Sequence, residues 1–457
     1  MPMAEDFVEG VHVRRVVAQV HRNAGRAQPI PAEPLPPQGL PESEAHRLSD
    51  EPREPRGVDQ SLSDADPASI RRASAYTRRL VNRVRRVGIN AVFLQPRMGG
   101  VETYVRRLVP ALLEAGPSLE LEIFVNAEGR KLLAAEPWAD SVRLFTHPLL
   151  GRRYTRALSE LTVLGAIASR RRLDVLHSVA LTGPIRTHPA HVLTIPDVIW
   201  MHEPDPAEVN TARLWRRIVP PVARRAERLL THSQAARTDV AETLRIPLER
   251  IDVVPHGPGT ERPAEPTPPA LEGRIVLSVS ALKMHKNLVP LVEAMRQVRD
   301  GVPDAVLVIP GNPTPHSREL KGLAHRLGIP DALVLPGWVD AGQLEGLYDA
   351  ANVFAFPSRR EGFGLPVLEA MRRGLPVACS AASSLPEVAG DAALLFDPDD
   401  ATSIAEAIRR ILEDRTLAVQ LAAAGRARAA EFTWERAAEG TLATYERALE
   451  AGRERRS

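Results

Sequence analysis

The stretch that most constrains the fold runs from residue 352 to residue 374, where a strand, a glycine loop and a helix are expected in turn. The apolar run Asn352–Phe356 predicts a buried strand. Pro366 fits the first helical position, where its missing N–H costs nothing, and Gly374 fits the residue just past the last turn. The pattern therefore predicts a strand–loop–helix unit of an α/β fold.

The loop and the start of this helix have the composition of an anion-binding site. Glu361 lies in the loop, and Glu369 is expected in the first turn of the helix. Glycines let backbone N–H groups approach a ligand closely, and the helix N-terminus adds a partial positive charge that suits a phosphate. Ionised carboxylates are good acceptors for sugar hydroxyls. From the residues alone, a sugar-phosphate site and a structural turn with two solvated acids are both open.

The spacing of the two acids resembles the E-x7-E motif of retaining GT-B glycosyltransferases of family four. The stretch that carries the resemblance is Glu361-Gly362-Phe363-Gly364-Leu365-Pro366, followed by Glu369. It continues through Leu375–Ala378, Ser384–Val388 and Phe432–Trp434, within residues 86–450. In that family the first Glu contacts the donor sugar and the second contacts the ribose. The resemblance thus implies a catalytic role for Glu361 and donor binding by Gly362, Phe363, Gly364, Leu365 and Glu369.

Length and charge exclude several other classes of protein. The 457 residues are enough for two or three domains, and a net charge of +2 gives no field that would favour nucleic acid. The one cysteine, Cys379, cannot form an internal disulfide, which favours a reducing compartment. The sequence shows neither a signal peptide nor a run of about eighteen apolar residues. We therefore expect a cytoplasmic protein.

The first 85 residues are expected to be a disordered, Pro/Arg-rich extension. Residues 29–55 are crowded with Pro, Glu and Arg and cannot bury enough apolar surface to offset the entropy of ordering. Residues 68–86 have the composition of a basic helix, and a second basic stretch spans Trp215–Arg228. Two interpretations are open for both: peripheral contact with the anionic inner face of the cell membrane, and a solvated surface.

A first Rossmann-like domain is predicted over residues 86–257, because apolar strands alternate there with amphipathic helices. Its first unit is a strand over Gly88–Leu94, a loop that ends in Gly99 and Gly100, and a helix over Val101–Ala115. The loop lacks the G-x-G-x-x-G pattern, so NAD is not proposed. The resemblance implies that the glycine pair binds the donor; a plain turn is the alternative.

Candidates for the acceptor side of the site follow two later strands of this domain. His177 ends one strand, and Asp197 and His202 follow another. Members of the family often carry a His directly before the Asp, close to the reacting sugar, but this sequence has Pro196 there. The family-style histidine contact is therefore in doubt, and His177, Asp197 and His202 are candidates for acceptor contact. A lone histidine is more often structural.

The second Rossmann-like domain is predicted over residues 273–432, after a Pro/Glu-rich linker at 258–272, and it would bind the nucleotide-sugar. A final helix at 433–457 is expected to cross back to the first domain. The pair Lys286-Asn287 resembles the family's Lys-Asn pair, whose Lys binds the donor diphosphate. A cation about 4 Å from a phosphate oxygen gains about 4 kcal/mol at an effective dielectric near 20, before desolvation is subtracted.

Three further donor-binding residues are expected in this second domain. Ala281 stands where many family members have an Arg; Lys283 is the first candidate to supply the missing charge, and His285 is the alternative. Gly337 and Val339 would lie near the nucleobase, as the resemblance implies.

Together these features predict an α/β protein of the GT-B type, with two facing Rossmann-like domains and parallel sheets. The resemblance implies a retaining, metal-independent glycosyltransferase that uses a nucleoside-diphosphate-sugar as co-substrate, needs no cofactor and acts on a glycan, lipid-linked or small-molecule acceptor. Lys286 and the backbone amides after Glu361 would stabilise the leaving group. Three alternatives are open: a GT-B sugar-nucleotide epimerase, a degenerate binding protein, which Pro196 and Ala281 would favour, and a membrane scaffold.

Overall fold

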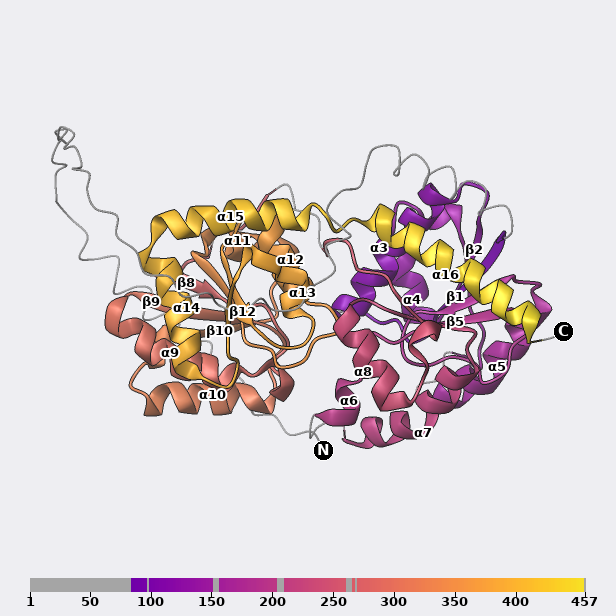
Figure 1. Ribbon diagram of the computed structural model, residues 1–457, viewed down its shortest axis with the longest axis horizontal. Helices are drawn as coiled ribbons and strands as arrows, with labels where there is room; N and C mark the ends of the chain where they lie inside the picture. The colour runs from indigo at the N-terminus through magenta and orange to yellow at the C-terminus, as the bar shows by residue number, and fades with distance from the viewer. Residues whose placement is uncertain are drawn as a thin grey trace, which may run out of the picture. The chain divides into compact units, whose positions relative to one another are not determined.

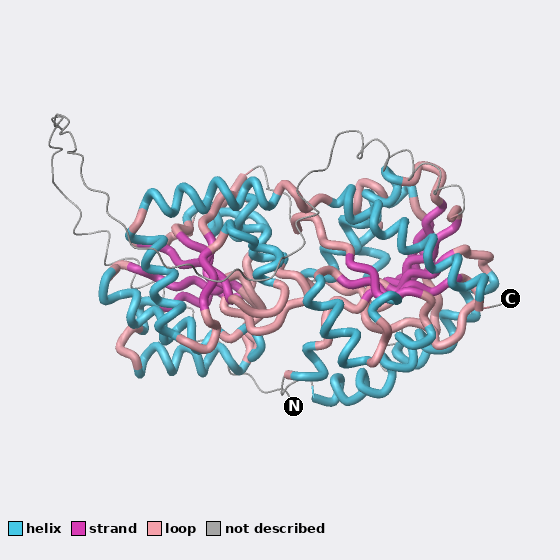
Figure 2. Tube along the Cα trace, viewed as in Figure 1, coloured by secondary structure: helices cyan, strands magenta, loops and turns pink. Residues whose placement is uncertain are grey.

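The computed structural model describes residues 84–96, 98–150, 156–203, 209–259, 265–267 and 269–455 of the chain. All of them belong to one compact unit, residues 65–457. The expected N-terminal extension lies outside the described residues, apart from its last two positions. The described part contains two parallel sheets, each flanked by helices (Figures 1 and 2).

The first sheet has the strand order β3-β2-β1-β4-β5-β6-β7, and every neighbouring pair is parallel. Its strands are β1 (Arg86–Ala91), β2 (Glu120–Val125), β3 (Arg143–Phe145), β4 (Val175–Ser178), β5 (Ala190–Thr194), β6 (Arg228–Thr231) and β7 (Ile251–Val253). The helices between them are α3 (Gly100–Ala115), α4 (Ala127–Leu133), α5 (Arg156–Arg170), α6 (Ile199–His202), α7 (Val209–Arg225) and α8 (Gln234–Leu244). The predicted alternation of apolar strands and amphipathic helices is therefore present.

The second sheet has the order β10-β9-β8-β11-β12-β13 and is also parallel throughout. Its strands are β8 (Arg274–Leu277), β9 (Ala305–Pro310), β10 (Leu333–Gly337), β11 (Val353–Phe356), β12 (Val377–Ser380) and β13 (Leu394–Phe396). Its helices are α9 (Leu288–Gly301), α10 (Pro315–Arg326), α11 (Ala341–Ala350), α12 (Leu365–Arg372), α13 (Leu385–Ala389), α14 (Ala401–Glu413) and α15 (Arg415–Ala429). The edge strand β13 was not predicted.

Both sheets reverse their strand order at one point, between β1 and β4 in the first and between β8 and β11 in the second. Helices that follow two such strands lie on opposite faces of the sheet, so the loops at the carboxyl ends diverge and leave a crevice for a ligand. The loops that carry Gly99, Gly100, Lys286 and Glu361 begin at these two reversal points.

Helix α16 (Trp434–Glu454) packs against α3 and strands β4, β5 and β6 of the first sheet, although it follows the second sheet in the chain. Its buried side chains recur at helical spacing and join the core beneath α3. They include Ala438, Leu442, Tyr445 and Ala448. The first sheet thus completes its core with the last helix of the chain.

Helix α12 begins one residue earlier than predicted. Leu365 is its first residue, so Pro366 occupies the second position, and Glu369 lies beyond the first turn. The reason is Gly364, whose φ of +114° turns the chain so that the next residue is already helical. Gly374 ends the helix with a φ of +70°, as predicted.

The basic stretch after residue 214 forms part of α7 and continues into β6. Trp215 packs edge to face on Trp200, with ring centroids 5.9 Å apart, and therefore contributes to the core. Arg228 pairs with Asp252 at 2.6 Å. Among the described residues, no helix is both long and apolar enough to cross a bilayer.

Candidate active site

The two strands that flank the reversal of the second sheet bring Lys286 and Glu361 together. Strand β8 leads into a short 3-10 turn that ends at Lys286, and β11 leads into the loop that carries Glu361. The Nζ atom of Lys286 lies 2.6 Å from Oε1 of Glu361, and the two side chains are only 16% and 11% exposed. The ammonium also lies 5.6 Å from the ring centre of Phe356. The two predicted catalytic residues therefore form one mostly buried ion pair.

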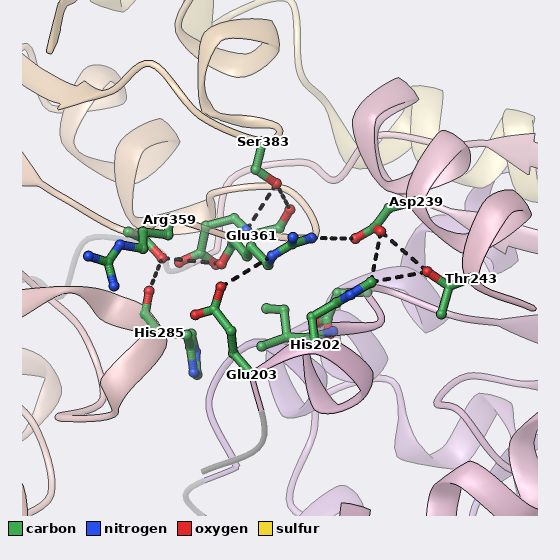
Figure 3. Close-up of polar contacts among 12 residues, drawn as sticks. His202, Glu203, Asp239, Thr243, His285, Arg359, Glu361 and Ser383 are labelled. Atoms are coloured by element: carbon green, nitrogen blue, oxygen red, sulfur yellow. Dashed lines mark hydrogen bonds and ion pairs between the residues drawn. The ribbon is translucent and has the colours of Figure 1, made fainter. Parts of the chain in front are cut away.

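Two serines that follow β12 fix the backbone of this loop. The Glu361 N–H donates to Ser383 Oγ at 3.2 Å, and Ser383 Oγ donates to the Glu361 carbonyl at 2.9 Å (Figure 3). Ser384 Oγ donates to the Phe363 carbonyl at 2.8 Å. Sequence reasoning did not assign these serines to the site. Their position directly after a strand of the same sheet is the signal that could have found them.

Gly362 is one of the points where residues that follow strands of the first sheet touch this loop. A Cβ atom at this position would lie 2.3 Å from the Pro196 carbonyl oxygen, so no larger residue fits without movement. The Gly362 carbonyl accepts a hydrogen bond from Ser233 Oγ at 2.8 Å. Pro196, which departs from the family pattern, therefore packs through its carbonyl directly against the loop.

Asp197 lies among the charges of the site, at the end of the segment that follows β5. Its Oδ1 accepts the Ile199 N–H at 3.1 Å. Burial raises the pKa of its carboxyl, the Ile199 hydrogen bond and Lys286 lower it, and Glu361 and Asp239 raise it further. A Cβ atom on Gly362 would lie 3.5 Å from Asp197 Cβ, so this acceptor-side candidate lies beside the loop that carries Glu361.

His177 has a structural position. Its Nδ1 lies 2.9 Å from the Tyr445 hydroxyl and its Nε2 lies 2.7 Å from Thr194 Oγ1. The side chain is fully buried, and burial lowers the pKa of the imidazole to about 3. Because both ring nitrogens have partners and no surface is exposed, the structure does not place this histidine at an acceptor. The cause is α16, which covers the end of β4.

His202 belongs to a polar cluster beside the loop. Its Nε2 lies 3.1 Å from Asp239 Oδ1 and 3.0 Å from Thr243 Oγ1 (Figure 3). Asp239 also pairs with Arg360 at 3.4 Å, and Glu203 pairs with the same arginine at 3.3 Å. His202 therefore reaches the loop through Asp239 and Arg360, a link that the sequence did not indicate.

The N-termini of α3 and α12 lie close to each other. Gly99 caps α3 with a φ of +66°, and a Cβ atom on Gly100 would lie 3.6 Å from Leu365 Cδ1. Helix N-termini carry partial positive charge and unpaired N–H groups, so two of them together suit an anion such as a diphosphate. The predicted donor-binding glycines thus lie beside the start of α12.

Glu369 is held from two sides. Its Oε2 accepts the Tyr348 hydroxyl at 3.2 Å. On the other side, a Cβ atom on Gly259 would lie 2.0 Å from Glu369 Oε1, so the linker backbone lies directly against the carboxylate. The carboxylate therefore lies between Tyr348 and the linker backbone at Gly259.

The other predicted donor-binding residues lie at different distances from the pair. Lys283 is partly buried and starts the turn that ends at Lys286. Gly337 and Val339 lie at the carboxyl end of β10, two strands away from β8. Phe363 is 5% exposed, and its ring packs 5.3 Å from His256 and 5.6 Å from Phe432. Its side chain therefore contributes to a core.

Within the described ranges, no three His, Cys, Asp or Glu side chains are arranged to hold a metal ion. An Asp-x-Asp sequence does occur at residues 397–399, after β13. There Asp397 Oδ1 accepts the Asp399 N–H at 2.9 Å, and Asp399 pairs with Arg359 at 2.6 Å. The second of these acids is therefore already neutralised by an arginine.

Two family models match consecutive parts of the chain. The model described as Glycosyltransferase Family 4 matches residues 98–262, and the one described as Glycosyl transferases group 1 matches residues 261–428. A curated MMP alpha-(1->4)-mannosyltransferase of Mycolicibacterium hassiacum is 32% identical over 307 residues, which is 62% of this chain and 73% of the relative. A D-inositol 3-phosphate glycosyltransferase of Xylanimonas cellulosilytica is 29% identical over 388 residues, 77% of this chain and 92% of the relative.

Solved structures show the same fold. A sucrose-phosphate synthase from Thermosynechococcus elongatus has a TM-score of 0.60 at 22% identity, covering 81% of this chain and 98% of that one. Anabaena Alr3699/HepE in complex with UDP and glucose has a TM-score of 0.59 at 18% identity, covering 78% of this chain and 97% of that one. At these identities the likeness concerns the fold alone.

Proposed function

Because the chain belongs to glycosyltransferase family 4 and has the GT-B fold, we propose that it transfers a sugar from a nucleoside-diphosphate-sugar to an acceptor hydroxyl, with retention of anomeric configuration. The observation that carries this proposal is the Lys286–Glu361 pair at 2.6 Å. It lies at the carboxyl edge of the second sheet, where the strand order reverses and a ligand crevice is expected.

The pair supplies both contacts that such a donor needs. Lys286 would bind the diphosphate and stabilise the charge that develops as it leaves, together with the amides at the start of α12. Glu361 neutralises this ammonium. A bound diphosphate would compete for the same ammonium and release the carboxylate to orient the sugar hydroxyls. Each 1.36 kcal/mol gained only in the transition state gives about tenfold in rate.

The leaving group would need no metal ion in this scheme, because one lysine and two helix N-termini already offer positive charge. The curated relatives named as mannosyltransferases make a mannosyl donor the first to test. We propose that the acceptor is a glycan, a lipid-linked sugar or a small molecule that carries a hydroxyl.

The decisive experiment incubates the protein with a panel of nucleoside-diphosphate-sugars, including GDP-mannose and UDP-glucose, and with candidate acceptors. Free nucleoside diphosphate and a new glycoside of unchanged anomeric configuration, measured by mass spectrometry and NMR, would support the proposal. An epimerised sugar nucleotide would indicate an epimerase, and donor binding without turnover would indicate a degenerate protein. Activity that is lost with EDTA and restored by a divalent ion would contradict metal independence.

Peripheral contact with an anionic membrane stays a prediction. The extension at residues 1–85 lies mostly outside the described residues, and α7 directs Trp215 into the core. Cosedimentation of the full chain with phosphatidylserine vesicles at low and high salt would test it, with phosphatidylcholine vesicles as the control. Equal recovery with both lipids would contradict the prediction.

A further inference from the structure

The structure assigns a positioning role to Ser233 and Glu387: we infer that they fix the donor loop, residues 361–364, so that its backbone N–H groups face the diphosphate of the donor. The inference rests on the proposed function, because the orientation of this loop affects a rate only if a donor is bound and transferred there. It adds to that function two residues that act on the donor through the backbone of the loop and link that loop to helix α8 of the first sheet.

Serine hydroxyl groups hold three consecutive carbonyl groups of the donor loop. Ser384 Oγ lies 3.0 Å from the Glu361 carbonyl oxygen and 2.8 Å from the Phe363 carbonyl oxygen. The carbonyl of Gly362, between them, accepts a hydrogen bond from Ser233 Oγ at 2.8 Å. Ser384 follows β12 of the second sheet, whereas Ser233 follows β6 of the first. Both sheets therefore contribute to the conformation of this loop.

The N–H groups of the same three peptide units have a different environment. Within the part of the chain that the structure describes, the N–H groups of Gly362, Phe363 and Gly364 have no hydrogen-bond partner, although all three residues are buried. Buried N–H groups without a partner are rare in folded proteins, because burial removes their hydrogen bonds to water. These amides directly precede α12, whose N-terminus adds partial positive charge. An anion such as a diphosphate is therefore the ligand that would satisfy them.

The geometry of the peptide bond connects the two observations. In a planar trans peptide unit the C=O and the N–H point in opposite directions, and the described residues contain no cis peptide bond. The Gly362 carbonyl and the Phe363 N–H belong to one such unit. By holding this carbonyl, Ser233 directs the Phe363 N–H to the side of the loop that faces away from α8. A change at Ser233 would therefore reach the donor through the Phe363 N–H.

Glu387 holds α8, the helix from whose N-cap Ser233 acts. Its carboxylate accepts the Gln234 N–H at 3.0 and 2.8 Å and the Ala235 N–H at 3.3 Å. A carboxylate suits this place because the first N–H groups of a helix have no partner within the helix and carry partial positive charge. Glu387 lies in α13, whose N-cap is Ser384. One short segment therefore holds both the donor loop and the start of α8.

Ser233 itself makes two hydrogen bonds that separate a structural from a functional role. Its Oγ accepts the Ala236 N–H at 3.0 Å, which is the ordinary bond of an N-cap residue. The same hydroxyl donates its proton to the Gly362 carbonyl. A helix cap needs only the first of these bonds. The second requires a hydroxyl group, so a substitution can remove it while the helix remains capped.

Ser233→Gly tests the inference, because it removes the hydroxyl and leaves a residue that caps a helix nearly as well as serine. With the panel donor that the wild type turns over, we expect kcat/KM to fall about tenfold, because the Phe363 N–H loses its alignment. The Kd of the corresponding nucleoside diphosphate, measured by isothermal titration calorimetry, should rise by a similar factor. The thermal midpoint should stay close to that of the wild type.

Glu387→Gln keeps an oxygen for one N–H of α8 but removes the charge, so we expect kcat/KM to be about threefold lower. Combined with Ser233→Gly it should add little, because both residues act through the same contact. Asp414→Gly is the matched control, since Asp414 caps α15 by accepting the Leu417 N–H at 3.0 Å. We expect wild-type kinetics and wild-type affinity for the nucleoside diphosphate from this control.

Wild-type kcat/KM and nucleoside-diphosphate affinity in Ser233→Gly would overturn the positioning role and leave the proposed function intact. A lowered thermal midpoint with unchanged kcat/KM would also overturn it, because the serine would then serve only the stability of α8. A wild type that turns over no donor on the panel would instead contradict the proposed function, and the role of Ser233 and Glu387 with it.

Discussion

The two sheets share one plan of strand order but use their reversal points differently. In the second sheet, β8 and β11 lead to Lys286 and Glu361, which form the ion pair of the site. In the first, Asn90 and His177 lie one residue before the ends of β1 and β4, and both are fully buried. His177 bonds to Tyr445 of α16. The strand order decides which side chains lie close together. The element that packs over them decides whether they can contact a ligand or become part of the core.

The largest expected effect is a loss of stability in acid, which should be greater in the first sheet than in the second. Burial lowers the pKa of His177 and His191 to about 3, of His232 to about 4, and that of His256 well below 6.5. These histidines stay neutral in the folded chain, while the unfolded chain binds protons below pH 6.5. Their contribution to the free energy of unfolding is therefore complete above pH 6.5. It falls as the pH drops towards 3–4, by about 1.4 kcal/mol per pH unit for each group.

Urea unfolding at pH 7.0, 6.0 and 5.0, followed by tryptophan fluorescence, measures this loss, because Trp138, Trp200, Trp215 and Trp434 pack around the first sheet. Hydrogen exchange should show faster opening in β4 and β5 than in β8 and β11 as the pH falls. Equal loss of protection in both sheets would contradict the comparison.

The second effect concerns Lys286, which follows β8 where the strand order of the second sheet reverses. Lys286→Met keeps the length of the side chain but removes the charge opposite the leaving group, so turnover should fall about 10²–10³-fold. Circular dichroism should show an intact fold. Lys321→Met, on the exposed face of α10, is the control and should retain full activity. Wild-type turnover in the Lys286→Met variant would contradict the proposal that Lys286 binds the diphosphate.

The third effect tests the contact between the two regions at Gly362. In Gly362→Ala the new methyl group would meet the Pro196 carbonyl oxygen at 2.3 Å, and overpacking of this kind costs about 1–3 kcal/mol. We expect a lower thermal midpoint and about tenfold lower turnover. Gly322→Ala, in α10 with its nearest neighbour at 3.5 Å, should instead stabilise the chain slightly. Equal thermal midpoints for Gly362→Ala and Gly322→Ala would show that the Pro196 carbonyl can move away from the new methyl group.

The smallest effect concerns the cluster around Arg360. This arginine, Glu203 and Asp239 are 36%, 36% and 32% exposed, so each pair should contribute less than about 1 kcal/mol. Arg360→Gln should lower kcat/KM by about threefold at low salt, because the loop loses one restraint, and the difference should vanish in high salt. A lower kcat/KM that persists in high salt would show that Arg360 does not act through its ion pairs with Glu203 and Asp239.

Local patterns predicted most of the fold, and the family resemblance pointed to Lys286 and Glu361 as the central residues of the site. The apolar strands and the Gly374 helix end could be predicted because their causes lie within a few residues. Residues distant in sequence supplied the rest. The burial of His177 depends on Tyr445, and the loop at Glu361 depends on Ser383. Such pairings are set by tertiary packing and leave no periodic trace in the sequence.

The position of α16 has a consequence for the order in which the chain acquires its structure on the ribosome. The second sheet contains its own apolar core and can form as soon as it emerges. The earlier sheet must wait for Leu442 and Tyr445, which are translated after every strand of both sheets. Its final consolidation can therefore begin only after α16 has been synthesised, and the nascent polypeptide exposes that unfinished apolar surface until then.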